Sequence, residues 1–131
     1  MDELVPGLIG EVSEFVTGQL TAVAVRSGLV NAYATPAMIA LMENASVAAI
    51  QKCLAKGQTS VGLEINVKHI AATPVGMRVH ARAELIAVAE RRVTFKIEAW
   101  DAKEKIGEGT HTRILVDAAR FKDKVEMKLR S

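Results

Sequence analysis

The chain has 131 residues, a length that suits one domain around a single hydrophobic core. We expect residues 1–131 to form that one domain. Half of the residues are hydrophobic and 24% are charged, which indicates a globular protein and excludes a disordered one. The formal net charge is +2, basic residues are scattered among acidic ones, and aromatic residues make up only 4%. A nucleic-acid-binding surface needs clustered cations and stacking rings, so no nucleic-acid partner is expected.

A single cysteine, Cys53, excludes an internal disulfide and a cysteine-rich zinc site. The N-terminal stretch "MDELVPGLIG" carries acidic residues where a signal peptide would carry basic ones. No apolar run approaches the ~18 residues of a membrane-spanning helix. We therefore expect a soluble, cytoplasmic protein with no membrane segment.

The first part of the chain is expected to contain a strand, a short helix and a loop. Residues 7–16 form the strand, although their alternation is imperfect. Residues 17–28 form the short helix, which begins at the N-cap Thr17 and stops at Gly28. Residues 29–34 then connect it to the next element.

A long helix is predicted next. Thr35 is a suitable N-cap, and Pro36 occupies the first helical position, where its missing N–H costs nothing. The helix runs to about Lys56 and ends at Gly57. Its first turns are apolar on nearly all sides, which indicates burial on most faces. One carboxylate, Glu43, interrupts this apolar helix.

From Thr59 onward the hydrophobic period changes to two, which is typical of strands with one buried face. Four strands and a C-terminal amphipathic helix follow, at residues 60–70, 77–85, 92–100, 108–116 and about 117–130. A buried helix followed by long antiparallel strands is an α+β pattern, and a sheet with one apolar face must wrap that face around the helix. The expected fold is therefore the hot-dog fold.

Two ionisable side chains are aimed into the same apolar layer. The odd positions of the strand after the helix are apolar and are predicted to face it: Val61, Leu63, Ile65 and Val67. His69 continues this series, and Glu43 lies on the helix. An unpaired buried charge is costly, so these two groups are expected to share a hydrogen bond or to face a common cavity.

Each of these residues also has a purely structural interpretation. A lone histidine on an apolar strand face is most often a satisfied core residue, a lone glutamate in a helix usually faces solvent, and Thr35 alone is an N-cap. His80 and His111 are both interpreted as structural. The chain contains no G-x-S-x-G, no H-E-x-x-H and no glycine-rich phosphate loop, which excludes serine-hydrolase, zinc and nucleotide-binding interpretations.

Three stretches together resemble a known family. "YATPAMIALMENA", "TSVGLEINVKHIAATPVGMRVHARAEL" and "IGEGTHTRILV" resemble the hot-dog-fold acyl-CoA thioesterases of the fluoroacetyl-CoA thioesterase-like group. The resemblance extends from about Phe15 to Phe121. Its most specific parts are the Thr…Glu spacing on the helix, the "H-x-A-x-T-P-x-G" stretch and the "G-x-G-T-H-x-R" strand.

The resemblance implies a set of catalytic and substrate-binding residues. The family's Thr–Glu–His constellation falls on Thr35, Glu43 and His69. The family also has a strand glycine whose backbone lies against the acyl group, and it matches Gly62. The arginine of the family's last strand, a candidate for contacting the substrate or the coenzyme A arm, matches Arg113. A small apolar position of the early helix matches Ala22.

The chain departs from this pattern at one place. Fluoroacetyl-selective members of the family have a longer loop before the catalytic threonine, where phenylalanines form a lid. The corresponding stretch here, "RSGLVNAYA", is short and contains no phenylalanine. The resemblance therefore implies thioester hydrolysis without implying selectivity for a fluorinated acyl group.

The implied reaction converts a short or small acyl-CoA and water to the free acid and CoA. Glu43 would act as nucleophile, through a transient anhydride, or as general base for water. His69 would hold or relay the proton, and Thr35 would orient a partner group. Eight residues of helix span ~12 Å, so Thr35 and Glu43 cannot touch if the helix is regular, unless its first residues fold back or the thioester lies between them.

Family members pair two subunits with active sites near the interface, so a homodimer or higher homo-oligomer is expected, with coenzyme A phosphates meeting surface Lys and Arg. No metal and no cofactor are implied, because coenzyme A is part of the substrate. Two alternatives remain. One is a non-catalytic acyl-CoA-binding hot-dog protein, and the other is a hot-dog dehydratase or hydratase, whose His/Asp motif is absent here.

Overall fold

The structure, a computed structural model, describes residues 3–130. Its main elements are β1 (Ile9–Phe15), α1 (Thr35–Ile50), β2 (Gln58–His69), β3 (Arg78–Ala89), β4 (Arg92–Trp100), β5 (Lys105–Asp117) and α2 (Ala118–Glu126). Three short 3₁₀ helices cover Gly18–Leu20, Gln51–Cys53 and Met127–Leu129. The predicted strands and the long helix are confirmed, with bounds that differ by a few residues.

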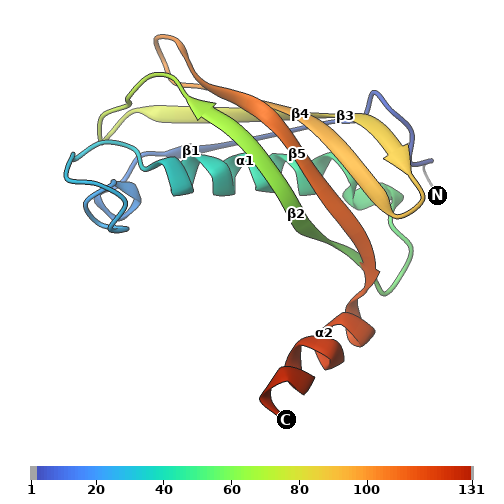
Figure 1. Ribbon diagram of the computed structural model, residues 1–131. Helices are drawn as coiled ribbons and strands as arrows, with labels where there is room; N and C mark the ends of the chain where they lie inside the picture. The colour runs from blue at the N-terminus through green and yellow to red at the C-terminus, as the bar shows by residue number, and fades with distance from the viewer. Residues whose placement is uncertain (1–2, 131) are drawn as a thin grey trace.

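One antiparallel sheet of five strands, in the order β1-β3-β4-β5-β2, curves around α1 (Figure 1). The alternation predicted for the two central strands is confirmed. Their buried residues are Val79, Ala81, Ala83 and Leu85 on β3, and Val93, Phe95, Ile97 and Ala99 on β4. These side chains pack against Met38, Met42 and Ile50 of α1 and form the core. The predicted α+β hot-dog architecture is confirmed.

Two glycines allow the sheet to approach α1 closely. A Cβ at Gly107 of β5 would lie 2.5 Å from the sulfur of Met38. A Cβ at Gly10 of β1 would overlap the backbone carbonyl oxygen of Ala45. A larger residue at Gly10 would push the backbone of α1 away from the sheet, whereas one at Gly107 would displace the Met38 side chain.

The bounds of α1 differ from the prediction at both ends. Ala34, not Thr35, is the N-cap, and Thr35 is the first helical residue. The α-helix ends at Ile50 rather than near Lys56, because a 3₁₀ turn follows and Leu54 is extended. The helix is also less enclosed than predicted, since the exposed positions after its first residue form one open stripe: Pro36, Ala40, Asn44 and Ala48.

The helix predicted for residues 17–28 is wrong. Only the turn Gly18–Leu20 is helical, and the Thr17 side chain makes no capping hydrogen bond. The later part of this segment is rich in Val and Thr, which lower helix propensity, and Arg26 has a positive φ of 63°. The result is an irregular segment in which Leu29 is 97% exposed.

The parity predicted for β2 is wrong at its first half. The pairing with β5 shifts register between Gly62 and Glu64, so that Gly62 lies opposite Arg113 and Ile65 lies opposite His111. Leu63 is the extra residue of this bulge, and half of it is exposed. The bulge therefore turns Gly62, rather than Leu63, toward α1.

The C-terminal helix projects away from the sheet (Figure 1). Asp117 caps α2 by accepting a hydrogen bond from the backbone N–H of Arg120 at 3.0 Å. The helix prediction is confirmed as Ala118–Glu126 plus a final 3₁₀ turn. None of the α2 residues is buried, however, and Leu129 of the final turn is 89% exposed, so the amphipathic face predicted for this segment is not covered by the described residues.

Candidate active site

Thr35 and His69 form the first polar pair of the site. Thr35 lies in the first turn of α1, His69 is the last residue of β2, and the threonine Oγ1 lies 2.7 Å from the histidine Nδ1. The imidazole Nε2 is buried and has no hydrogen-bond partner within residues 3–130. Burial lowers the pKa of His69, so its ring is neutral at physiological pH.

Glu43 belongs to a second cluster, farther along α1. Its Oε2 accepts a hydrogen bond from Arg113 Nη1 at 3.2 Å and lies 3.7 Å from His111 Nε2. The Arg113 side chain is 9% exposed and that of His111 is 2% exposed, whereas 40% of the Glu43 side chain is exposed. The carboxylate therefore lies at the open edge of the apolar layer rather than deep inside it.

Arg113 is held in place from the side of β2. Its Nε donates to the Ser60 hydroxyl at 2.8 Å, and its Nη2 donates to the Ser60 carbonyl oxygen at 3.0 Å. Burial lowers the pKa of Arg113, while the adjacent Glu43 opposes this change. A guanidinium stays protonated in proteins, so Arg113 and Glu43 form an ion pair.

Gly62 leaves room for the carboxylate. A Cβ at this position would lie 2.8 Å from Glu43 Oε2, which is closer than normal packing permits. The two residues line a hollow of about 220 Å³ together with Leu63, Glu64, Ile65 and His111. The hollow thus brings together a carboxylate, a neutral histidine and an apolar wall.

Ala22 lies beside the other pair. It lines a separate hollow of about 320 Å³ with Val30, Tyr33 and His69. This hollow and the Glu43 hollow have no lining residue in common. Within one chain, Glu43 and His69 share neither a hydrogen bond nor a hollow, so the expectation that they would do so is wrong. Different segments of α1 and β2 carry them, and the predicted residues fall into two separate clusters, called half-sites below: Thr35 and His69 with Ala22, and Glu43 and Arg113 with Gly62.

His111 is the residue of this cluster that the sequence analysis missed. It was interpreted as structural, yet it lies next to Glu43 and Arg113. The available signal was strand parity, because His111 and Arg113 are two residues apart on β5 and must share a face. His80, in contrast, lies on the outer side of the sheet, where its ring contacts Ser13 and Glu11 as expected for a polar-face residue.

A five-stranded antiparallel sheet around one helix, with ionisable groups at the open edge of the layer, defines a hot-dog-fold protein with an enzyme-like site. Residues 16–119 match the family of fluoroacetyl-CoA-specific thioesterases. A fluoroacetyl-CoA thioesterase of Streptantibioticus cattleyicolor is 42% identical over 96 residues, which are 73% of this chain and 69% of that protein.

Solved structures agree with this assignment. The fluoroacetyl-CoA thioesterase FlK superposes with a TM-score of 0.92 at 33% identity, over 97% of this chain and 98% of that chain. A hypothetical protein of Thermus thermophilus, described as a thioesterase superfamily member, superposes with a TM-score of 0.89 at 25% identity, over 99% and 97% of the two chains. The chain belongs to the fluoroacetyl-CoA-specific thioesterase family, and it is a thioester hydrolase of the acyl-CoA thioesterase type.

Within residues 3–130, no helix is both long and apolar enough to cross a membrane.

Proposed function

We propose that this protein hydrolyses a short or small acyl-CoA to the free acid and CoA, with Thr35, Glu43 and His69 as its catalytic residues. The observation that carries the proposal is a half-exposed carboxylate, Glu43, which lines a hollow beside Gly62, where a Cβ would lie 2.8 Å from Glu43 Oε2. A carboxylate in such a position can activate water or attack a thioester carbonyl. The proposed reaction uses water and these side chains, with no metal or cofactor.

Bond changes in this reaction balance without any further reactant. The carbonyl carbon gains a C–O bond from water and loses its C–S bond, and the proton that Glu43 removes from water ends on the coenzyme A sulfur. If Glu43 attacks first, water hydrolyses the resulting anhydride and regenerates the carboxylate. The free Nε2 of His69 and the Thr35 hydroxyl supply the polar groups that orient the thioester or relay the proton.

A homodimer would assemble the two half-sites into one. β2 is an edge strand of the sheet, with Gly62 in its first half and His69 at its end. When two such edges pair antiparallel about a twofold axis, the His69 end of one strand lies opposite the Gly62 end of the other. Thr35 and His69 of one subunit would then face Glu43 of its partner, and the exposed edge would be covered.

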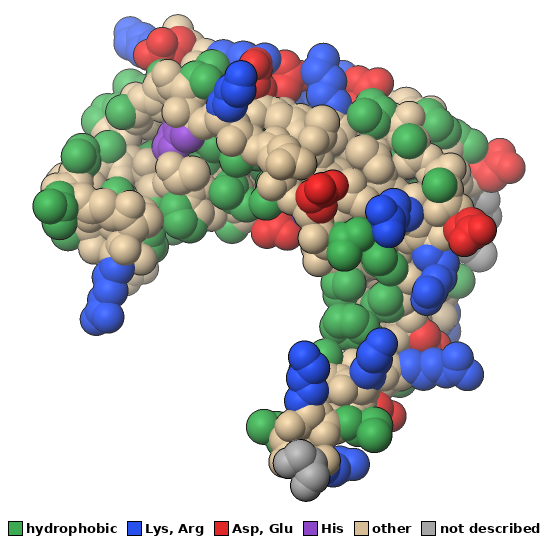
Figure 2. Space-filling model, viewed as in Figure 1, with side chains coloured by type: hydrophobic (Ala, Val, Ile, Leu, Met, Phe, Trp, Pro, Cys, Tyr) green, Lys and Arg blue, Asp and Glu red, His purple; other side chains and the backbone are tan. Residues whose placement is uncertain are grey.

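The coenzyme A arm has a suitable path on the same face. A hollow of about 530 Å³ shares Gly62 and Leu63 with the Glu43 hollow and extends to Arg91, Arg120 and Lys124. Figure 2 shows apolar side chains gathered where β2 and β5 lead into α2, with Lys and Arg around them. We propose that the pantetheine chain crosses this apolar floor and that the phosphates meet these three cations.

The residues beside each half-site bear on the acyl group. Gly62, Arg113 and Ala22 are proposed to contact the substrate, since they line or border the two hollows. Two of the relatives named above are fluoroacetyl-CoA thioesterases, but residues 26–34 of this chain contain no phenylalanine. We therefore propose a small acyl group without proposing selectivity for fluorine.

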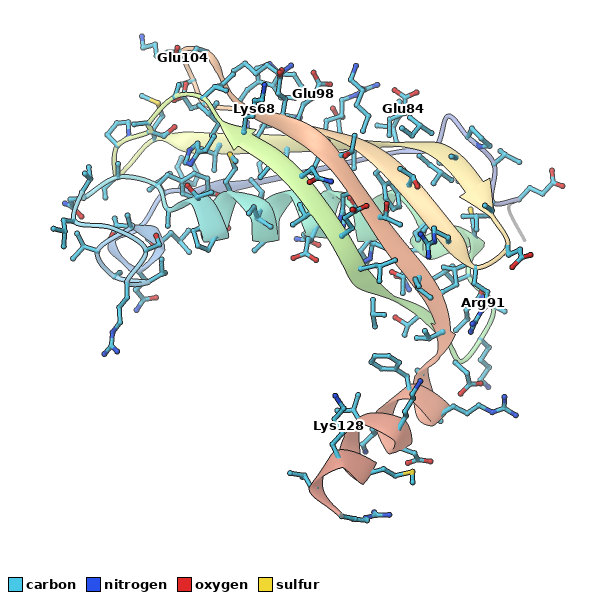
Figure 3. All side chains as sticks on the ribbon, viewed as in Figure 1. Lys68, Glu84, Arg91, Glu98, Glu104 and Lys128 are labelled. Carbon is cyan, nitrogen blue, oxygen red and sulfur yellow. The ribbon has the colours of Figure 1, made fainter. Side chains whose placement is uncertain are left out.

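Release of free thiol, measured with DTNB, tests the proposal across acetyl-, butyryl-, aromatic and fluoroacetyl-CoA. Glu43→Gln should lower kcat by about 10²–10⁴-fold, the usual worth of a general base. Glu84→Gln is the matched control, because Glu84 is also a half-exposed glutamate beside an arginine, on the outer face of the sheet (Figure 3).

Each outcome of the assay distinguishes the proposal from its alternatives. Wild-type rates in Glu43→Gln would contradict the role of that carboxylate. Binding of acyl-CoA without thiol release would indicate a non-catalytic binding protein. A change in the acyl group while CoA stays attached would indicate a hydratase or dehydratase.

A further inference from the structure

His111 is a buried histidine to which the proposed mechanism gives no task. It is 2% exposed and lies on the inner face of β5. Its ring stacks on Phe95 of β4, with ring centroids 6.2 Å apart, and lies opposite Ile65 of β2. We propose that His111 is a positioning residue that aims the Arg113 guanidinium at Glu43, an inference that rests on the proposed function.

The hydrogen bonds of the His111 ring define its tautomer. Nδ1 lies 2.8 Å from the backbone carbonyl oxygen of Glu64, and a carbonyl oxygen can only accept. Nδ1 therefore carries the proton and donates it. Burial lowers the pKa of His111, so the ring is neutral and Nε2 presents a lone pair.

That lone pair faces Arg113. The Nη1 of Arg113 lies 3.2 Å from His111 Nε2 and 3.2 Å from Glu43 Oε2. Nη1 carries two hydrogens, so one can be donated to the histidine and the other to the carboxylate. The histidine and the carboxylate are both acceptors, 3.7 Å apart, and therefore act on each other only through the arginine between them.

This geometry makes Arg113 a fixed reference for Glu43. Ser60 holds two nitrogens of the guanidinium and His111 holds the third, which leaves one hydrogen of Nη1 directed at the carboxylate. Arg113 is the hydrogen-bond donor that reaches the Glu43 side chain within residues 3–130. Because 40% of that side chain is exposed, its direction depends on this single contact, and a catalytic group displaced by ~1 Å can lose 10²-fold in rate.

The same surroundings show what protonation of His111 would do. The groups around its ring are Glu43 from α1, the Glu64 carbonyl from β2, Phe95 from β4 and Arg113 from β5. A proton on Nε2 would point a second donor at Arg113 and compete with it for Glu43. The neutral form is therefore the one that keeps the arginine aimed.

Two amide variants separate the two hydrogen bonds of His111. In His111→Gln, the longer side chain places its amide near the Nε2 position, so an acceptor for Arg113 remains. In His111→Asn, the amide lies near the Nδ1 position, so the donor to the Glu64 carbonyl remains while the acceptor for Arg113 is lost. Both variants lose the ring that packs on Phe95, so the packing lost is similar in the two and the difference between them reports the hydrogen bonds.

We expect His111→Asn to lower kcat by about 10-fold or more and to keep KM within about 2-fold of the wild type. The variant loses the orientation of Arg113 and Glu43, whereas substrate binding is retained. His111→Gln should keep kcat within about 3-fold of the wild type. Thr110→Asn, on the exposed face of the same strand, is the control and should leave both constants unchanged. Thermal unfolding of each variant separates loss of fold from loss of rate.

Equal kcat values for the two amide variants would overturn the proposal, because that result is expected if His111 has only a structural role. An effect of His111→Asn on KM alone would also overturn it. If His111→Asn does not fold, His111→Gln decides alone: kcat near the wild type supports the proposal and a loss of 10-fold or more contradicts it. Unchanged kcat in Glu43→Gln would instead refute the proposed function, whatever the His111 variants do.

Discussion

The proposed assembly of one site from the half-sites of two subunits predicts that two inactive variants will restore activity when mixed. Glu43→Ala removes the carboxylate of one half-site, and His69→Ala removes the imidazole of the other. If each complete site takes Glu43 from one subunit and His69 from its partner, neither homodimer contains an intact site. A mixed dimer contains one intact site and one site that lacks both groups.

The size of the recovery follows from the proposed twofold dimer. Random exchange of equal amounts makes about half of the dimers mixed, and each mixed dimer holds one working site of two, so the mixture should reach about one quarter of wild-type activity. The parent variants should each retain on the order of 10⁻²–10⁻⁴ of it. The recovery therefore exceeds the background at least tenfold and is measurable as thiol release with DTNB.

The control pairs two variants of the same half-site, Thr35→Ala and His69→Ala. Thr35 Oγ1 and His69 Nδ1 lie 2.7 Å apart within one chain, so both residues belong to the same half-site. Every site of a mixed dimer therefore lacks one of them, and no recovery is expected. Subunits are exchanged by refolding from urea or by co-expression with two tags. A Glu43→Ala and His69→Ala mixture that stays at background, although mixed dimers are isolated, would refute the shared site.

Four further predictions concern single positions and pH. Gly62→Ala should lower kcat by about 10²-fold, because its Cβ would lie 2.8 Å from Glu43 Oε2. Gly18→Ala is the control and should leave kcat unchanged, because a Cβ at that position has no other atom within 4 Å. Steady-state kinetics of the two variants test this. Burial lowers the pKa values of His69 and His111 below 6.5, so the acidic limb of the kcat/KM profile should have its midpoint below pH 6.5. Between pH 6.5 and the lower folded-state pKa values, the unfolded chain binds more protons than the folded chain. The free energy of unfolding, measured by urea titration, should therefore fall as the pH drops through 6.5. It should level off below the folded-state pKa values. Phe95→Ala should cost about 3–5 kcal/mol of that free energy by emptying the centre of the core; a loss below ~1 kcal/mol would contradict the assigned packing.

The sequence predicts much of the fold because its strands obey one simple rule. β3 and β4 alternate strictly, and their odd positions are the buried ones from Val79 to Leu85 and from Val93 to Ala99. Regular alternation has only one arrangement that buries every apolar side chain against a helix. Where the pattern was weak, as in residues 17–28, local preference for turns prevailed and the predicted helix did not form.

The bulge in β2 marks the limit of that rule. Alternation continues through Val61, Leu63 and Ile65 in the sequence, yet the chain inserts Leu63 as an extra residue. Pairing with β5 decides this, because Arg113 and His111 take the inner positions opposite Gly62 and Ile65. A long-range pairing cannot be read from the strand that is bulged.

The same bulge explains how the carboxylate of Glu43, the proposed catalytic group, can occupy an otherwise apolar helix. With regular alternation, Leu63 would face α1 and Gly62 would face outward, and the space beside Glu43 would be filled by a leucine side chain. The inserted residue exchanges them, so a glycine lies beside the carboxylate and Leu63 moves to the exposed edge. Glu43 then remains near water and near the edge of β2, where a second subunit would bring Thr35 and His69. Gly62→Leu, which places a leucine side chain beside Glu43, should therefore fill the hollow and abolish thiol release while the chain still folds, and a crystal structure with DTNB assays of this variant would test that link.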